Sequence, residues 1–158
     1  MMIRFAFSTL VAVAAVAALA ACNSGGTVNP TPTVGPTCGP PSGIQSVLVY
    51  PARGATGVND ANGQIVIGST AALPTNTSTD NWDIAIVDNV FPNGTTMPGA
   101  LTTTTPPFPT PNATPSFANP VYQTQAFGSP FAAGQTVKVY INNLATNCAP
   151  LLLGQFST

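Results

Sequence analysis

Beyond its apolar first segment, the chain consists of short runs of β-forming residues that are separated by Pro, Gly and Asn. Runs of this kind form strands, and the residues between them form turns. No later segment has the periodicity of an amphipathic helix. Six or seven short strands between residues 44 and 158 therefore predict an all-β fold, a single antiparallel β-sandwich.

The expected strands can be placed from hydrophobic runs and turn signals. They cover residues 44–51, 64–69, 82–87, 100–105, 121–128, 135–142 and 151–158. In residues 82–87, Trp82, Ile84 and Ile86 alternate with Asp83, Ala85 and Val87, and we expect the first set to face the core. In residues 135–142, Val137, Val139 and Ile141 share one face and Thr136, Lys138 and Tyr140 the other. Residues 91–120 are rich in Pro and Thr, which predicts a long loop that is either a functional protrusion or edge structure.

The first residues have the pattern of a secretory signal peptide. Arg4 precedes an apolar run from Phe5 to Leu19, and small residues follow. The run is short and Ala-rich for a membrane-spanning helix. Its end, Leu-Ala-Ala-Cys at residues 19–22, resembles the bacterial lipobox. This resemblance implies cleavage before Cys22, a diacylglyceryl group on its sulfur and acylation, as with palmitate, of the new amine. The alternatives are an ordinary signal peptide with an incidental Cys and a retained membrane helix.

These signals divide the chain into three parts. We expect a signal peptide at residues 1–21, a lipidated Cys22 with a Pro/Gly/Thr-rich tether at 22–43, and the β-domain at 44–158. Several acyl chains suffice for stable anchoring to a membrane, so the expected partner of the N-terminus is the bilayer. Asn23 follows the lipobox Cys, which by resemblance to Gram-negative lipoproteins favours the outer membrane.

The other two cysteines, Cys38 and Cys148, are expected to form a disulfide. An exported chain matures in an oxidising compartment, and an even number of cysteines remains once Cys22 is lipidated. Two free thiols or an intermolecular bridge are the alternatives.

Three short motifs resemble bacterial Ig-like domains. They are "YPARGATGV" at residues 50–58, "FAAGQTVKVYI" at 131–141 and "GQFST" at 154–158. The resemblance implies an Ig-like or fibronectin-III-like sandwich. In a seven-strand sandwich the first and last strands run in the same direction, so Cys38 and Cys148 are expected at the same end.

The composition excludes most catalytic chemistry. Charged residues make up 4% of the chain, the net charge is -1, and the chain has neither His nor Glu. Ser/His/Asp and Cys/His machinery is therefore excluded, and a paired-carboxylate hydrolase would need Asp alone. Three Lys and Arg residues cannot form a basic patch, which argues against nucleic-acid binding. We expect no catalysis, no bound metal and no cofactor.

Two Asp-containing loops are the remaining candidates for a ligand site. Asp60 and Asn62 have the Asp-x-Asn-Gly spacing found in calcium-binding loops, but the distal bidentate carboxylate of such loops is lacking. A plain Asx turn is the alternative. Asp80 and Asp83 would supply ligands from a second loop, although Asp83 is also able to pair with Lys138 or Arg53. Trp82 is expected in the core rather than as a sugar platform. Tyr50, Tyr122 and Tyr140 would form an aromatic strip if they shared a face.

The sequence thus predicts a lipid-anchored envelope protein that displays a non-catalytic Ig-like module with a structural or protein-interaction role. Its expected partners are the membrane and a protein or glycan at the cell surface. The alternative is a lipoprotein that binds a ligand, either a carbohydrate or a ligand held through calcium, with the two Asp-containing loops.

Overall fold

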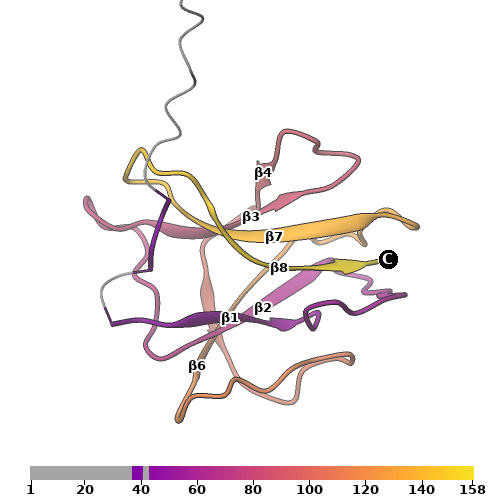
Figure 1. Cartoon of the computed structure of the whole chain (residues 1–158), viewed down its shortest axis with the longest axis horizontal. Coiled ribbons are helices and arrows are strands. Elements are labelled where there is room, and N and C mark those ends of the chain that lie inside the picture. The colour runs from indigo at the N-terminus through magenta and orange to yellow at the C-terminus, as the bar shows by residue number, and fades with distance from the viewer. Residues whose placement is uncertain (1–36, 41–42) are drawn as a thin grey trace, which may run out of the picture. The chain divides into compact units, whose positions relative to one another are not determined.

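The computed structural model describes residues 37–40 and 43–158, which form eight strands in two antiparallel four-stranded sheets (Figure 1). The strands are β1 Ser46–Tyr50, β2 Gln64–Ser69, β3 Trp82–Val87, β4 Thr95–Thr96, β5 Thr102–Thr104, β6 Val121–Ala126, β7 Thr136–Asn143 and β8 Leu151–Ser157. Sheet 1 has the order β1-β2-β6-β5, and sheet 2 has the order β4-β3-β7-β8. The predicted all-β sandwich is confirmed.

The predicted strands are all present, and their bounds differ by a few residues at most. β2 and β3 match the prediction at both ends, whereas β1 begins at Ser46 rather than at Ile44. β4 was not predicted, because two residues are too short to show an alternating pattern. It pairs with Ala85 and Ile86 of β3 and closes one edge of sheet 2.

The core lies between the inner faces of the two sheets. Trp82, Ile84 and Ile86 are buried as predicted, and the inward residues of β7 are fully buried beside them. Sheet 1 contributes Leu48, Ile65 and Ile67 to the same continuous apolar cluster, and β8 contributes Phe156. Burial of this cluster supplies the main driving force for folding in a chain with so few charges.

Two glutamines on β6 are buried in this core and hydrogen-bond to backbone outside their own sheet. The Gln123 side chain accepts from the N–H of Leu73 and donates to its carbonyl, at 2.7 and 3.1 Å. The Gln125 side chain accepts from the N–H of Ile84 on β3 at 2.8 Å and donates to the Gly99 carbonyl at 2.6 Å. These amides satisfy backbone groups at positions where no strand is available to pair with them.

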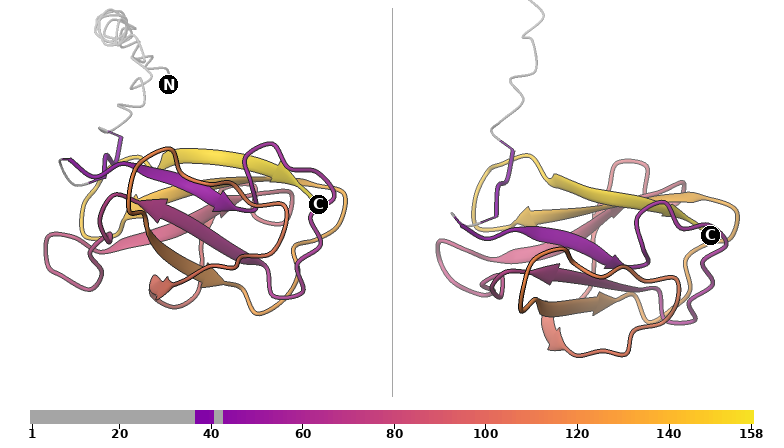
Figure 2. Two further views of the ribbon diagram at one scale, coloured as in Figure 1. Left: turned by 90° about the horizontal axis from the view of Figure 1, so that it is seen from below. Right: turned by 60° about the horizontal axis from the view of Figure 1, so that its bottom comes forward.

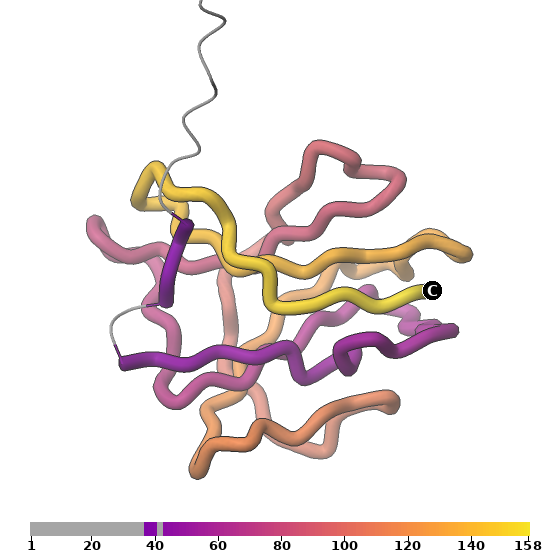
Figure 3. The backbone as a smooth tube through the Cα atoms, in the orientation of Figure 1, coloured from indigo at the N-terminus to yellow at the C-terminus, as the bar shows by residue number. Residues whose placement is uncertain are grey.

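The Pro-rich residues 105–120 lie over the outer face of sheet 1. In the tube view they run out and back beside β1 (Figure 3). Ala113 donates its N–H to the Val49 carbonyl at 2.9 Å, and Ala52 donates to the Pro111 carbonyl at 2.9 Å. The alternative of edge structure is confirmed for part of residues 91–120, because β4 and β5 are edge strands. The alternative of a protrusion is wrong, because residues 105–120, called the cover segment below, pack onto the domain.

A second, smaller apolar cluster lies under the cover segment. A bulge between Leu48 and Tyr50 breaks the β1–β2 register, and Val49 and Tyr50 both join the outer cluster. Val66 and Tyr122 complete it from β2 and β6, and the Phe108 ring meets the Tyr122 ring edge-on at 4.9 Å. Apolar residues thus lie on both faces of sheet 1, and the cover segment shields its outer face.

The three tyrosines do not form the strip that was considered. Tyr50 is buried and Tyr122 partly buried under the cover segment, in sheet 1. Tyr140 lies on β7 in sheet 2, at a position that alternates with the core residues Val139 and Ile141. The tyrosines therefore belong to the outer faces of opposite sheets.

The two ends of the sandwich differ in what they carry. β1 and β8 run in the same direction, as Figures 1 and 2 show, so the segments before both strands lie at one end. This end, called the disulfide end below, carries Cys38 and Cys148. The opposite end, called the far end, carries the turn at Asp60 and the loops at residues 88–94 and 127–134.

Candidate functional site

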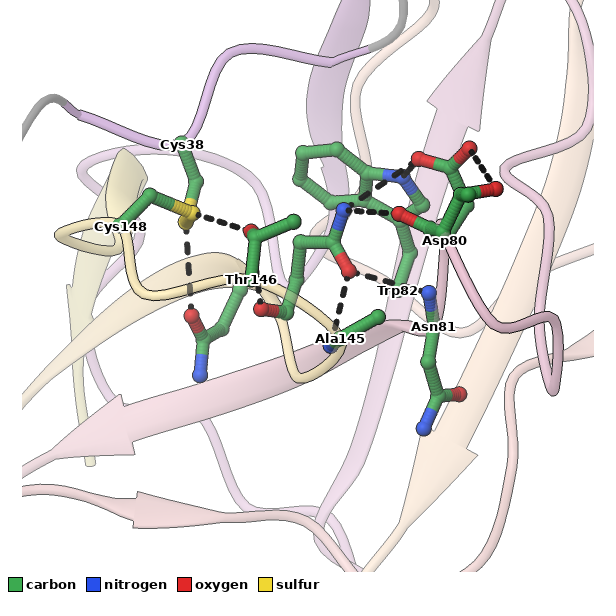
Figure 4. The surroundings of a disulfide bond; sticks show 10 residues. Cys38, Asp80, Asn81, Trp82, Ala145, Thr146 and Cys148 are labelled. Atoms are coloured by element: carbon green, nitrogen blue, oxygen red, sulfur yellow. Dashed lines mark hydrogen bonds between the residues drawn. A yellow bond between two sulfur atoms is a disulfide. The ribbon is translucent and has the colours of Figure 1, made fainter.

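The disulfide between Cys38 and Cys148 is formed as predicted, and it joins the start of the domain to the β7–β8 connection (Figure 4). The two Cα atoms are 5.0 Å apart, inside the usual range for a disulfide. The Cys38 N–H also donates to the Ala149 carbonyl, at 2.6 Å. Where residue 37 enters the domain, the chain is therefore held by one covalent bond and by backbone pairing.

Asp80 and Trp82 form a hydrogen-bonded network beside the disulfide (Figure 4). The Trp82 ring nitrogen donates to Asp80 Oδ1 at 3.2 Å, and Asn143 Nδ2 donates to the same oxygen at 3.2 Å. Asn143 Oδ1 in turn accepts from the N–H groups of Asn81 and Ala145. The indole is buried, as expected for a core residue, and the Asp80 carboxylate is engaged in fixing the loop.

The loop at Asp60 is an Asx turn, which was the plainer of its two interpretations. Asp60 Oδ1 accepts from the Asn62 N–H at 2.7 Å, and the Asp60 carbonyl accepts from the Gly63 N–H at 3.3 Å. The Tyr50 and Asp60 side chains line one shallow hollow at this end. Burial, followed by hydrogen bonding to Asp60 and its negative charge, raises the pKa of Tyr50 well above its usual range.

Asp83 has no basic partner in its strand register, so the expected pairing with Lys138 is wrong. Asp83 lies opposite Asn142, whereas Lys138 lies opposite Val87. The stem of Arg53, the other basic candidate, packs against Gly154 of β8 instead. The Asp83 carboxylate accepts from the N–H of Ile84 at 2.8 Å. Burial raises the pKa of Asp83, although this bond and one from Gln125 act in the opposite direction.

Asp88 directly follows β3 and fixes the loop at residues 88–94. Its Oδ1 accepts from the N–H groups of Val90 and Phe91, at 2.8 and 2.7 Å. Its other oxygen accepts from Gln135 at 3.4 Å. The carboxylate is buried, and it acts as a local cap for a tight turn.

The structure does not bring the four predicted ligand residues together. Asp60 and Asn62 belong to the far end, because they precede β2, and Asp80 belongs to the disulfide end, because it precedes β3. Asp83 follows Asp80 but directs its carboxylate to backbone of its own strand. In residues 37–40 and 43–158, no three acidic, Cys or His side chains are grouped so that they could hold a metal ion.

A hollow that the sequence did not predict lies on the outer face of sheet 2. It has a volume of about 420 Å³ and is lined by Ala85, Ile86, Val87, Asn93, Gly94, Thr95, Thr96, Tyr140, Asn142 and Pro150. We call it the sheet 2 hollow. The alternation of residues 135–142 predicts that Tyr140 lies on the outer face. One side of the hollow is formed by residues 93–96, however, and their position depends on the unpredicted strand β4.

Two further observations concern the whole chain. Cys22 and the expected signal peptide lie outside the described residues, and in the described part no helix is long and apolar enough to cross a membrane. Comparison with protein-family models, with curated proteins and with solved structures finds no match.

Proposed function

We propose that this chain is a lipid-anchored envelope protein whose β-sandwich is a non-catalytic module displayed at a membrane surface. The disulfide end carries this proposal, because the N-terminal boundary of the domain is bonded to the β7–β8 connection. A pull on the tether would then be transmitted into two strands at once, which suits a module that is held from its N-terminus.

The carboxylates also support a non-catalytic role. The Asp60, Asp80, Asp83 and Asp88 side chains each accept hydrogen bonds from nearby backbone or side-chain groups that fix a turn or strand end. A general acid or base needs a carboxyl group that can reach a substrate proton. Groups that are engaged in holding loops are poorly placed for that task.

We further propose that the sandwich is of the Ig-like type. In that fold the first, second, fifth and fourth strands of the A-to-G series form one sheet, and the C, F and G strands form the other. The orders β1-β2-β6-β5 and β4-β3-β7-β8 fit this scheme if β4 is the additional strand beside C. The strand order supports the type independently of the sequence motifs.

Intact mass spectrometry of the protein from its native membrane tests the anchor. The expected mature chain starts at Cys22, carries the mass of its acyl groups and gains two hydrogens on reduction of the disulfide. A Cys22→Ala variant is the matched control and is expected to lose the acyl mass while keeping the disulfide. A native chain that is cut elsewhere and carries no lipid would contradict the proposal.

A further inference from the structure

We propose that the sheet 2 hollow binds a neutral saccharide. The inference goes beyond the proposed function, because it assigns a ligand class to a face on which display and anchoring do not depend. The polar side chains of the domain differ in whether they take part in internal hydrogen bonds. The four aspartates are engaged in internal hydrogen bonds, whereas no hydrogen bond among the described residues engages the side chains of Asn93, Thr96 or Tyr140.

The strand register sets these groups around an apolar floor. Thr96 of β4 lies directly opposite Ala85 of β3, and Ala85 lies directly opposite Tyr140 of β7. Neighbouring strands are about 4.8 Å apart, so Thr96 and Tyr140 are separated by about 10 Å with a single methyl group between them. A small residue between a hydroxyl side chain and an aromatic ring leaves a recess in an otherwise flat sheet face.

The β3–β4 turn forms one wall of the recess. Gly94 has a φ of +85°, and a Cβ atom there would lie 3.3 Å from Val87 Cγ2. The absence of a side chain lets the turn approach the outward side chain of Val87. Asn93, which precedes Gly94, also lines the hollow and brings a side-chain amide to this wall.

The chemistry of the lining selects a neutral, polyhydroxylated ligand. Amide and hydroxyl groups both donate and accept hydrogen bonds, which suits the hydroxyl groups of a sugar. The Tyr140 ring and the methyl groups of Ala85 and Val87 offer apolar contact to the C–H face of a pyranose. No charged side chain lines the hollow. Lys138 lies opposite the lining residue Val87, but it is exposed to solvent, which screens its charge from a ligand in the hollow. Its volume of about 420 Å³ falls within the range of small-ligand sites.

A peptide that adds a strand at the adjacent edge fits less well. β4 is two residues long, and beyond it the Ile84 N–H is already bonded to the Gln125 side chain while the Ile84 carbonyl accepts from Met97. Strand addition needs a row of unpaired backbone groups. The sheet face itself remains open, since Thr96 and Lys138 are exposed and Leu152 is 49% exposed.

Titration calorimetry on the full-length protein in detergent tests the inference. The probes are cellohexaose, chitohexaose, maltohexaose, laminarihexaose, xylohexaose and mannohexaose, with hexagalacturonate as the acidic counterpart. We expect at least one neutral hexasaccharide to bind at millimolar concentration or below. Tyr140→Ala is expected to weaken that binding at least tenfold through loss of the aromatic wall.

Two variants make the result decisive. Thr96→Arg changes an exposed residue at the rim, so it should block the hollow without disturbing the core, and it decides the question if Tyr140→Ala fails to fold. Tyr122→Phe removes a tyrosine hydroxyl on the opposite sheet and is expected to bind like the wild type. The inference is overturned if no neutral probe binds, if hexagalacturonate binds as tightly as the best neutral probe, or if Thr96→Arg leaves the affinity unchanged. A lipidated chain that binds none of the sugars would overturn it and leave the proposed function standing.

Discussion

At the scale of single residues, buried side-chain amides form hydrogen bonds with backbone groups that a neighbouring strand would otherwise pair. Gln123 and Gln125 are each 4% exposed, and their side chains pair with backbone groups of the loops that connect the two sheets. Buried polar groups of this kind are costly only when they lack partners, and no buried side-chain nitrogen or oxygen of the described residues lacks one. A chain with 4% charged residues can therefore still have a highly specific polar interior.

Replacing Gln125 with Ala should be strongly destabilising. The change removes one of the two acceptors of the Ile84 N–H, the other being Asp83 Oδ1, and it removes the donor to the Gly99 carbonyl. It also leaves a cavity in the core, since Gln125 is buried. Lost hydrogen bonds of about 1 kcal/mol each, together with the cavity, should lower the free energy of unfolding by about 2–3 kcal/mol. Urea denaturation measures it. The exposed Gln155→Ala is the control and should change stability by less than about 0.5 kcal/mol. Equal effects of the two variants would contradict the assigned role of Gln125.

The raised pKa of Asp83 makes a prediction about pH. Its carboxyl group is buried, so the charged form is less favourable in the folded state than in the unfolded state. The stability contributed by the neutral form is complete below the unfolded pKa of about 3.9 and is lost as pH rises through the higher folded pKa. We expect Asp83→Asn, which keeps the Oδ1 acceptor, to gain stability relative to the wild type as pH rises from 3.5 to 7. Urea denaturation at both values checks this, and a difference that does not change with pH would refute it.

At the scale of elements, the cover segment is the main departure from what the sequence predicts. Strand runs such as those of β2 and β3 are visible because alternation is a local property of the sequence. The cover segment has no such period. The burial of its few apolar residues, such as Phe108, depends on contact with distant residues such as Tyr122, which the local sequence does not reveal. The sheet 2 hollow escaped prediction for a related reason, since Thr96 and Tyr140 become neighbours only through pairing of β4, β3 and β7. The disulfide was predictable, because it followed from a count of cysteines and the direction of two strands.

Gly68→Ala should separate the cover segment from sheet 1. A Cβ atom at Gly68 would lie 2.8 Å from Pro115 Cγ and 3.0 Å from Val49 Cγ2, closer than packed carbon atoms approach. Overpacking of this kind typically costs about 1–3 kcal/mol. We expect that loss of stability together with faster amide hydrogen exchange at Ala113, whose N–H bonds to β1. Gly39→Ala is the matched control, since a Cβ atom there has no neighbour within 4 Å. Unchanged exchange at Ala113 in the Gly68 variant would contradict the described packing.

At the scale of the whole domain, the outer faces of the two sheets differ in what covers them, and the two ends differ in what they carry. The outer face of sheet 1 is closed by the cover segment, and the outer face of sheet 2 keeps an open hollow with free polar groups. The disulfide end joins the domain to the residues that precede it. The hollow extends along the outer face of sheet 2, from the β3–β4 turn to Asn142 and Pro150 near the disulfide end.

Removing the disulfide tests how far the domain depends on its attachment point. The bond closes a loop with a sequence separation of 110 residues. In the chain-entropy model, a loop of about that length contributes about 4–5 kcal/mol by restricting the unfolded chain. We expect the double variant Cys38→Ala/Cys148→Ala to lose about that much free energy of unfolding in urea, and the wild type under reducing conditions to behave in the same way. Cys22→Ala, which leaves the pair intact, should unfold at the wild-type urea concentration. A loss below about 1 kcal/mol would instead mean that the unfolded chain is already restricted without the bond.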